Sequence, residues 1–287
     1  GSHNPPEYNG LKMMVAGVTL YGEAIQALYA VASAPDLDSR IAAIAPGTTR
    51  ELDLSENYLN RITSDIKLAR PMKVAIDCGN GVAGAISPQL FKALGCELQE
   101  LFCEVDGNFP NHHPDPSVPE NLRDVVHALA TTDAEIGLAF DGDGDRLGIV
   151  TKDGSIIYAD RLLMLFAADV LSRNANGKII FDVKCTRNLA PWIKNHGGTP
   201  IMWKTGHSFI KAKLIETKAL LAGEMSGHIF FKERWYGFDD ALYAGARLLE
   251  LLSHKTDISA ALHDLPDSIS TPELQIHVTE GENHLLI

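Results

Sequence analysis

Three aspartates alternate with two glycines in the segment Asp141-Gly142-Asp143-Gly144-Asp145, which Arg146 follows. Carboxylates at this spacing repel one another, so the pKa of each would be raised unless a cation lay among them. Glycine lets the backbone wrap tightly because it adopts positive φ angles at little cost. A hard divalent cation with oxygen ligands suits such a loop. The mostly apolar run before it, residues 135–140, predicts a buried strand, and open α/β sheets bind ligands at the carboxyl ends of their strands.

Other interpretations of this acidic loop remain open. An EF-hand also begins Asp-x-Asp-x-Asp, but it requires Gly at loop position 6 and Glu at position 12, where this chain has Arg146 and Lys152. A phosphatase that forms an aspartyl-phosphate would also place paired aspartates after a strand, with Asp141 as the nucleophile. The loop could also be a solvated acidic turn without a ligand.

Composition limits the class of protein. A chain of 287 residues suggests about two domains, and 45% apolar with 22% charged residues is typical of globular proteins. The net charge of −12 argues against a nucleic-acid surface, which would need a basic stripe. Since no apolar run is long enough to span a bilayer and no signal peptide is visible, we expect a cytoplasmic protein with no membrane partner.

The cysteines show no C-x-x-C spacing. We expect buried thiols in a reducing compartment rather than a disulfide framework or a zinc site. The four are Cys78, Cys96, Cys103 and Cys185.

The first twelve residues contain two prolines and several turn formers, which predicts a loop. Gly1-Ser2-His3 could be the remains of an expression tag. After this loop we expect a helix over 20–33, a strand over 41–45 and a helix over 53–70. The last residues, 272–287, begin a strand without completing a unit, so both ends look cut from a longer chain.

From residue 71 the pattern alternates between strands and helices in two similar rounds, which predicts an α/β fold of two layers, each with its own core. The first round comprises strands over 73–78, 97–103 and 135–140, helices over 82–94 and 120–131, a long loop over 106–119, and a hairpin of 147–150 with 156–158. The second comprises helices over 160–173, 187–195, 208–216 and 239–253, and strands over 178–182, 200–203, 219–222 and 228–231.

Two motifs in the first round resemble ligand-binding motifs, but we interpret both as structural. Residues 79–84 match G-x-G-x-x-G after a strand, with Glu100 about where a ribose-binding acid would fall. We favour a tight strand-to-helix turn because nothing downstream resembles a hydride-transfer site. His112 and His113 are adjacent in an extended loop and cannot easily face one metal, so we interpret them as loop structure.

Polar residues follow three strands of the second round. Lys184 follows the first strand, Lys204-Thr205-Gly206-His207-Ser208 the second, and Gly223-Glu224-Met225-Ser226-Gly227-His228 the third. Each segment could be a plain turn or a helix cap. All three are nevertheless expected at one edge of a parallel sheet, where their side chains could hold the hydroxyls and the phosphate of a sugar.

Four motifs in the same order resemble the α-D-phosphohexomutases, and within them the bacterial phosphomannomutase/phosphoglucomutase members. They are Gly1-Ser2-His3-Asn4-Pro5 with Asn9-Gly10-Leu11-Lys12, the acidic loop with Arg146, the 204–208 segment and the 223–228 segment. The resemblance implies consecutive mixed-sheet α/β domains in a partial chain. Residues 1–45 would end domain 1, 46–153 would form metal-binding domain 2, 154–268 sugar-binding domain 3, and 269–287 would begin domain 4.

The resemblance also implies residue roles. Ser2 would be the phosphorylated nucleophile and would bind Mg²⁺ together with Asp141, Asp143 and Asp145. Lys12, a candidate general acid/base, and Arg146 would lie near the phosphoserine. The substrate-binding residues would be His3, Asn4, Lys184, Thr205, Gly206, His207, Glu224, Ser226 and His228.

The implied reaction is reversible phosphoryl transfer between C1 and C6 of mannose and glucose phosphates through a hexose 1,6-bisphosphate, a step in carbohydrate and polysaccharide-precursor metabolism. We expect a monomer whose only partner is a small sugar phosphate. This chain alone should be inactive, because family members also use a phosphate-binding loop in domain 4. The alternatives are an aspartyl-phosphate sugar phosphatase and a non-catalytic Ca²⁺-binding module.

Overall fold

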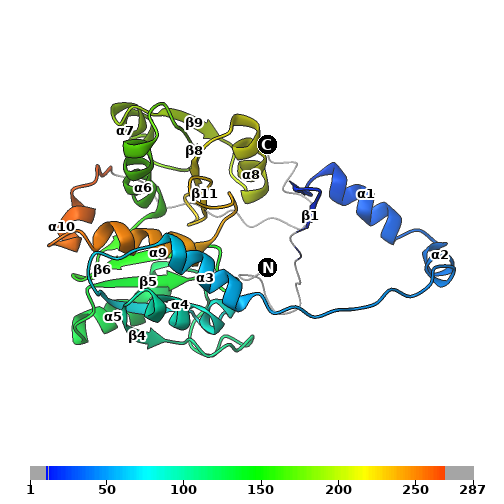
Figure 1. The fold of residues 1–287 in the computed structure, drawn as a ribbon, viewed down its shortest axis with the longest axis horizontal. Coiled ribbons are helices and arrows are strands. Elements are labelled where there is room, and N and C mark those ends of the chain that lie inside the picture. Colours follow the sequence, from blue (N-terminus) through cyan, green and yellow to red (C-terminus); the bar gives the residue numbers. More distant parts are fainter. Residues whose placement is uncertain (1–10, 12, 269–287) are drawn as a thin grey trace.

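The computed structural model describes residue 11 and residues 13–268 (Figure 1). Ser2, His3, Asn4 and Lys12 of the predicted site lie outside the described residues. The strand expected from residue 272 also lies outside them.

A five-stranded sheet carries the acidic loop. Its strand order is β4 (Glu97–Leu101), β3 (Lys73–Asp77), β5 (Ile136–Phe140), β6 (Leu147–Thr151) and β7 (Ile156–Ile157). β3 runs parallel to β4 and β5, whereas β6 and β7 are antiparallel additions. All five residues of β5 are buried, as expected for a central strand covered on both faces.

A four-stranded sheet carries the three polar loops. Its order is β11 (Ile229–Phe231), β10 (Leu221–Gly223), β8 (Lys178–Asp182) and β9 (Thr199–Trp203). β8 is parallel to β9 and β10, and β11 pairs antiparallel with β10. The segments after β8, β9 and β10 therefore lie at one edge, as predicted.

The helices complete the two layers. They are α1 (Glu23–Ala32), α2 (Leu37–Ala42), α3 (Ser55–Asp65), α4 (Ser87–Ala93), α5 (Arg123–Thr131), α6 (Ala159–Arg173), α7 (Leu189–Asn195), α8 (His207–Thr217), α9 (Ala241–Leu252) and α10 (Ile258–His263). Short 3₁₀ turns span Val82–Ala85 and Pro119–Leu122, and a small hairpin pairs β1 (Met14–Val15) with β2 (Val18–Thr19).

One hydrophobic core runs through both layers. It includes Phe140 of β5, Phe166 of α6, Phe231 of β11 and Leu248 of α9. In Figure 1, α9 lies at the junction of the two sheets, and it contacts strands of each. Two separate clusters lie on the outer faces, one under α5 and one under α8. The expectation of two independent cores was therefore wrong for the inner faces.

Several boundaries differ from the prediction. The strand expected over 41–45 is wrong: α2 occupies Leu37–Ala42, and Arg40 N donates to Asp36 O at 3.0 Å. A short apolar run does not by itself distinguish helix from strand. The helix expected over 53–70 ends at Asp65, after which Ile66 is extended. The helix expected over 82–94 is a 3₁₀ turn followed by α4. The sequence prediction also missed α10 and the β1–β2 hairpin.

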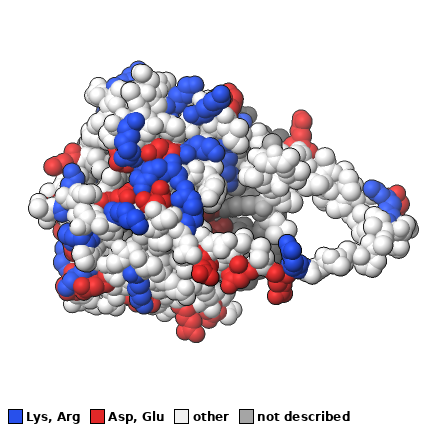
Figure 2. Space-filling view, viewed as in Figure 1, with Lys and Arg blue, Asp and Glu red and all other residues white. Residues whose placement is uncertain are grey.

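The segment that contains α1 and α2 lies apart from the two layers in Figure 1, and none of the residues of these two helices is buried. On the face shown in Figure 2, basic side chains are interspersed with acidic ones over the junction of the sheets. Ion pairs also join the layers: Arg234, in the segment after β11, contacts Asp65 of α3 at 3.2 Å and Glu250 of α9 at 2.8 Å. No helix of the described residues has both the length and the apolar character needed to cross a membrane.

Candidate functional site

The acidic loop is wound around the carboxylate of Asp141. Its Oδ1 accepts the backbone N–H groups of Asp145 at 2.9 Å and Arg146 at 3.0 Å, and its Oδ2 accepts Nε–H of Arg146 at 2.9 Å. Gly144 has φ of +74°, a value that favours glycine. Burial raises the pKa of Asp141, and the negative charge of Asp143 adds to the rise, whereas Arg146 opposes it. The loop thus holds carboxylates close together despite their electrostatic repulsion.

The donor set of this loop fits a hard cation. One carboxylate oxygen each from Asp141, Asp143 and Asp145 can be chosen so that all three lie within 4.8 Å of one another. Asp143 is exposed, whereas the other two are buried. Because an ionised carboxylate has about four lone-pair sites, Asp141 can coordinate a metal while it accepts its hydrogen bonds. Carboxylate oxygens are the ligands that Mg²⁺ and Ca²⁺ prefer.

A second group of possible ligands comprises Asp145, His228 and Asp239. Here Lys211 Nζ already contacts Asp239 Oδ1 at 2.9 Å. The ammonium supplies the positive charge that a cation would otherwise bring. The three-aspartate group is therefore the better candidate for the metal.

Arg146 is buried beside the acidic loop. Its Nη1 donates to Asp115 Oδ1 at 3.1 Å, so a residue of the long 106–119 loop completes the site. Its buried Nη2 has no hydrogen-bond partner among the described residues. A buried cationic donor left over in this way can bind an anionic oxygen such as that of a phosphate.

Asp182, which the sequence analysis missed, joins the polar loops of the second sheet. It is fully buried at the end of β8, where its Oδ2 accepts Thr205 Oγ1–H at 2.8 Å and its Oδ1 accepts the N–H of Met225 at 3.3 Å. Cys185 Sγ donates to it at 3.0 Å. The sequence did contain a signal for Asp182. It is the last residue of an apolar strand, and a charge buried at that place needs partners.

Glu224 connects two of these loops directly. Its side chain is buried, and its Oε1 accepts the N–H of Gly206 at 2.5 Å. Gly206 has φ of +127°, and a Cβ there would lie 2.9 Å from the ring of Phe209, so glycine is required. Burial raises the pKa of Glu224, which the Gly206 hydrogen bond partly offsets. Its Oε2 is buried without a hydrogen-bond partner in the described part of the chain.

The acidic loop and the Gly223–His228 turn are in direct contact across the two layers. Leu147 N donates to Gly227 O at 3.2 Å, and Arg146 pairs with His228 in an antiparallel bridge. A Cβ at Gly227 would lie 3.2 Å from Leu147 O, so the close approach depends on glycine. Ala241 N also donates to Gly144 O at 3.1 Å. The predicted metal loop and one predicted sugar-binding loop therefore lie against each other.

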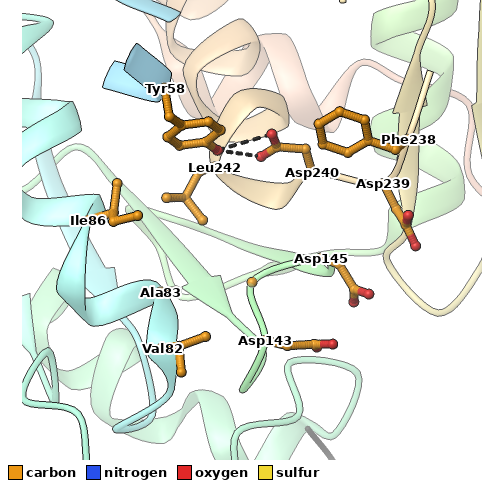
Figure 3. Close-up of a pocket in the computed structure, with 11 residues that line it drawn as sticks. Tyr58, Val82, Ala83, Ile86, Asp143, Asp145, Phe238, Asp239, Asp240 and Leu242 are labelled. Atoms are coloured by element: carbon orange, nitrogen blue, oxygen red, sulfur yellow. Dashed lines mark hydrogen bonds between the residues drawn. The ribbon is translucent and has the colours of Figure 1, made fainter. Parts of the chain in front are cut away.

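A cavity of about 260 Å³ opens beside the acidic loop. Figure 3 shows Asp143, Asp145 and Asp239 across the cavity from Val82 and Ile86. Tyr58 OH donates to both carboxylate oxygens of Asp240, at 2.8 and 3.0 Å, in the wall of this cavity. Burial raises the pKa of Asp240 to about 6.

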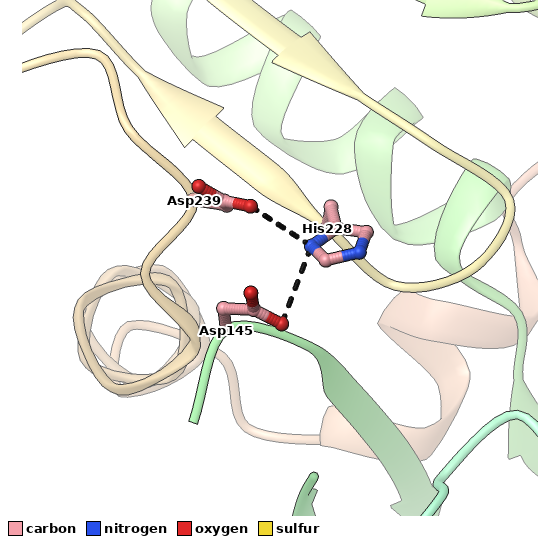
Figure 4. Close-up of side chains that lie close together, drawn as sticks. All are labelled: Asp145, His228 and Asp239. Atoms are coloured by element: carbon pink, nitrogen blue, oxygen red, sulfur yellow. Dashed lines mark ion pairs between the residues drawn. The ribbon is translucent and has the colours of Figure 1, made fainter. Parts of the chain in front are cut away.

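The remaining predicted residues lie at the same edge. His207 is the first residue of α8, and its ring centroid lies 5.8 Å from that of His228. Figure 4 shows His228 beside Asp145 and Asp239. Ser226 is half-buried in the β10–β11 turn. Lys184 is exposed in the turn after β8. The structure thus groups Arg146, Glu224, His207 and His228 closely, and places Lys184 at the rim.

The G-x-G-x-x-G segment is a packed turn that supports the acidic loop. Val82 N donates to Gly142 O at 2.9 Å, and a Cβ at Gly81 would lie 2.7 Å from Gly142 Cα. Glu100 forms an ion pair with Lys92 at 2.6 Å. These contacts agree with the turn interpretation rather than a dinucleotide site.

His112 contacts a buried acid at the end of a strand. Its Nε2 lies 3.1 Å from Asp77 Oδ2, and this hydrogen bond raises the pKa of His112. The pair braces the carboxyl end of β3, in agreement with the interpretation of these histidines as loop structure.

The prediction of buried thiols holds for Cys78 and Cys96 but is wrong for Cys103 and Cys185, which are half-buried. All four are free, and Cys103 Sγ lies 3.6 Å from Cys78 Sγ. The two thiols meet because the parallel strands β3 and β4 end side by side.

Comparisons with known proteins agree with the fold. Residues 56–154 match the phosphoglucomutase/phosphomannomutase alpha/beta/alpha domain II, and residues 158–269 match domain III. A phosphoglucomutase of Neisseria meningitidis serogroup A is 65% identical over 99% of this chain and 61% of its own length. A phosphomannomutase/phosphoglucomutase of Pseudomonas aeruginosa is 58% identical over all of this chain and 61% of its own length. The chain thus spans about three fifths of these relatives.

A crystal structure of a phosphoglucomutase/phosphomannomutase family protein from Burkholderia thailandensis has a TM-score of 0.89 and 61% identity, and the match covers 94% of this chain and 58% of that one. The fold match and the two matched domains confirm the resemblance of the four motifs. The chain belongs to the phosphoglucomutase/phosphomannomutase family.

Proposed function

We propose that this chain forms the central part of an enzyme that moves a phosphoryl group between C1 and C6 of hexose phosphates. The observation that carries the proposal is the direct contact between the acidic loop and the Gly223–His228 turn. A cation held by the acidic loop and a sugar held by the loops of the second sheet would share one site. The proposed domain boundaries follow residues 45, 153 and 268. The chain would then contain the end of domain 1, all of domains 2 and 3, and the beginning of domain 4.

Ser2 would carry the phosphoryl group and donate it. The free hydroxyl oxygen of the substrate attacks phosphorus and the bond from phosphorus to the Ser2 oxygen breaks. The hydroxyl proton passes to a base, for which Lys12 is our candidate, and the released Ser2 oxygen takes up a proton to become a hydroxyl. The hexose 1,6-bisphosphate then turns around and returns its other phosphoryl group to Ser2. Bound Mg²⁺ would neutralise charge on the transferring group.

Arg146 is suited to assist this transfer. Its Nη2 is a buried cationic donor without a partner in the described structure. Hydrogen bonds from Arg to phosphate are charge-assisted and directional. Asp115 and Asp141 hold the guanidinium in place.

The second sheet would hold the sugar. Glu224 Oε2 is a buried acceptor that can receive a sugar hydroxyl, with Ser226 next to it in the same turn. Thr205, Gly206, His207 and His228 would supply further contacts to the substrate, and Lys184, which is exposed after β8, would meet a phosphate. Since Glu224 and Ser226 would hold hydroxyls other than that on C2, both glucose and mannose phosphates are proposed substrates.

The phosphatase alternative requires Asp141 to attack phosphorus. Asp141 is fully buried and its Oδ2 is covered by the guanidinium of Arg146, so the side chain is not open to in-line attack on phosphorus. A nucleophile needs a free, exposed oxygen lone pair in line with phosphorus. The geometry favours a supporting role for Asp141 over a nucleophilic one.

The position of the phosphate tests the proposal. Mass mapping of the active protein, in a form that has the length of its relatives, should find one phosphate on Ser2. Ser2→Ala should abolish both the phosphate and the turnover, because no other residue is proposed to carry the group. Ser64→Ala is the matched control, since Ser64 is an exposed-face residue of α3 whose hydroxyl donates to the Arg61 carbonyl of the same helix. A phosphate on Asp141, or full activity of Ser2→Ala, would overturn the mutase assignment.

A further inference from the structure

Two thiols meet at the carboxyl end of the five-stranded sheet. Cys78 directly follows β3, and Cys103 lies two residues after the end of β4. Their Sγ atoms are 3.6 Å apart, although the residues are 25 positions apart in the sequence. A disulfide bond requires about 2.05 Å between the sulfurs, so the two atoms at 3.6 Å would have to approach by about 1.5 Å.

The backbone before Cys103 is bent in a way that creates this contact. Continued past its last pair, the register of β3 and β4 would place Phe102, not Cys103, opposite Cys78. Phe102 has φ of +50°, which is uncommon for a bulky residue. Asn80 holds the bend, because its N–H donates to Phe102 O and its Nδ2 to Glu104 O, both at 2.8 Å. A backbone conformation of this kind persists where its surroundings enforce it, often at functional positions.

The two thiols differ in access and in acidity. Cys78 is fully buried, with its Sγ 3.1 Å from Ser87 Oγ, whereas Cys103 is half-buried. The hydrogen bond with Cys78 lowers the pKa of Cys103 and outweighs burial and the charges of Glu100 and Asp77, which raise it. The same hydrogen bond, together with burial, raises the pKa of Cys78. Because the thiolate is the form that oxidants attack, Cys103 is the member of the pair that reacts first.

The other two cysteines of the chain, both in its described part, do not share these properties. Cys96 is buried, and burial raises its pKa to about 12. Cys185 is half-buried like Cys103, but its Sγ donates to Asp182 Oδ1 at 3.0 Å, and burial together with that acid raises its pKa. Cys185 therefore matches Cys103 in burial class but not in acidity.

We propose that Cys78 and Cys103 form a reversible disulfide when the protein meets hydrogen peroxide. The Cys103 thiolate attacks a peroxide oxygen, the O–O bond breaks, hydroxide leaves, and Cys103 becomes a sulfenic acid. The Cys78 sulfur then attacks the Cys103 sulfur, the S–O bond breaks, and the departing hydroxide takes the Cys78 proton to form water. Two thiols and one peroxide thus give one disulfide and two waters. The proposal does not depend on the proposed function.

The bond would join strand ends that already lie side by side. Cys78 N donates to Leu101 O at 3.1 Å, so the backbone on both sides of the thiol pair is connected before any oxidation. We therefore expect the disulfide to form in the folded protein. Disulfides in reducing compartments are usually transient or redox-sensing, which suits a pair that is reduced in the resting state.

Peroxide treatment of the reduced 287-residue protein, followed by alkylation after unfolding and peptide mass mapping, tests the proposal. Two of the four thiols should be lost to alkylation, and the map should contain Cys78 and Cys103 peptides joined with the loss of two hydrogens. Dithiothreitol should restore all four thiols. The circular dichroism spectrum of the oxidised protein should match that of the reduced protein.

Three variants separate the steps. Cys185→Ser is the matched control and should form the disulfide as fast as the wild type. Cys103→Ser should leave Cys78 open to alkylation after the same treatment. Cys78→Ser should leave Cys103 as a sulfenic acid that dimedone traps. Oxidation of Cys185 before Cys103, four free thiols after treatment, or a disulfide that appears only after the folded spectrum is lost would overturn the proposal.

Discussion

Asp143→Asn should lower kcat/KM of the complete protein by about 100-fold, which corresponds to about 2.7 kcal/mol at 1.36 kcal/mol per factor of ten. Asp143 is the exposed member of the three aspartates, and it lies in a loop rather than in the core. The substitution removes a negative charge from the donor set but keeps the size of the side chain. A hard cation prefers charged oxygen ligands, so the metal should bind more weakly and stabilise the transferring group less.

Two other variants sharpen this prediction. Asp124→Asn is the matched control, because Asp124 is an exposed aspartate in the first turn of α5, on the outer face of the same layer. It should leave both activity and stability unchanged. Asp141→Asn should lose activity and also about 1–3 kcal/mol of unfolding free energy, because Asp141 supports the loop and Arg146 through hydrogen bonds. Unchanged activity of Asp143→Asn with limiting Mg²⁺ would contradict the metal assignment.

Arg247→Met should lower the free energy of unfolding by about 3 kcal/mol or more, the cost of removing one partner from a buried ion pair. Arg247 is fully buried in α9, the helix that contacts both sheets. Its Nη2 lies 2.9 Å from Asp169, its Nη1 lies 3.1 Å from Glu233, and its guanidinium is 4.5 Å from the ring of Phe231. Methionine retains much of the apolar volume but leaves the two acids without their buried cation.

Arg173→Met is the matched control for this effect. Arg173 contacts the same two acids, Asp169 at 2.5 Å and Glu233 at 3.2 Å, but its side chain is 41% exposed. Because solvent screens such pairs, its loss should cost no more than about 1 kcal/mol. Urea unfolding of both variants measures the difference. Equal losses would show that burial of Arg247 is not what makes its ion pairs important.

The parts of the fold that the sequence predicted are those set by local pattern. The buried run before the acidic loop predicted β5, and parallel strand order placed the polar loops at one edge. The sequence prediction failed where tertiary contacts determine the structure. The apolar run near Ile41 suited helix or strand equally, and it became α2. The continuous core could not be foreseen, since the helix period of α9 does not show that it contacts two sheets.

In the candidate site, too, residues set by local sequence were predicted and residues brought in by tertiary contacts were not. Asp141, Asp143 and Asp145 are adjacent in sequence, so their spacing revealed them. Asp115, Asp182 and Asp239 support the site from other segments, and each contacts a residue outside its own loop or strand. Spacing carries no information about such pairs. Only the apolar strand that ends in Asp182 offered a local signal, because a charge at the end of a buried strand requires a partner.

Phosphorus-31 NMR of glucose 1-phosphate mixed with the complete, phosphorylated protein and Mg²⁺ tests the central claim most directly. The site described here predicts that the resonance of glucose 6-phosphate appears while total sugar phosphate stays constant, and that mannose 1-phosphate is converted in the same way. A chelator of divalent cations should stop both conversions. Release of inorganic phosphate in place of the 6-phosphate, or no change in either spectrum, would contradict the account.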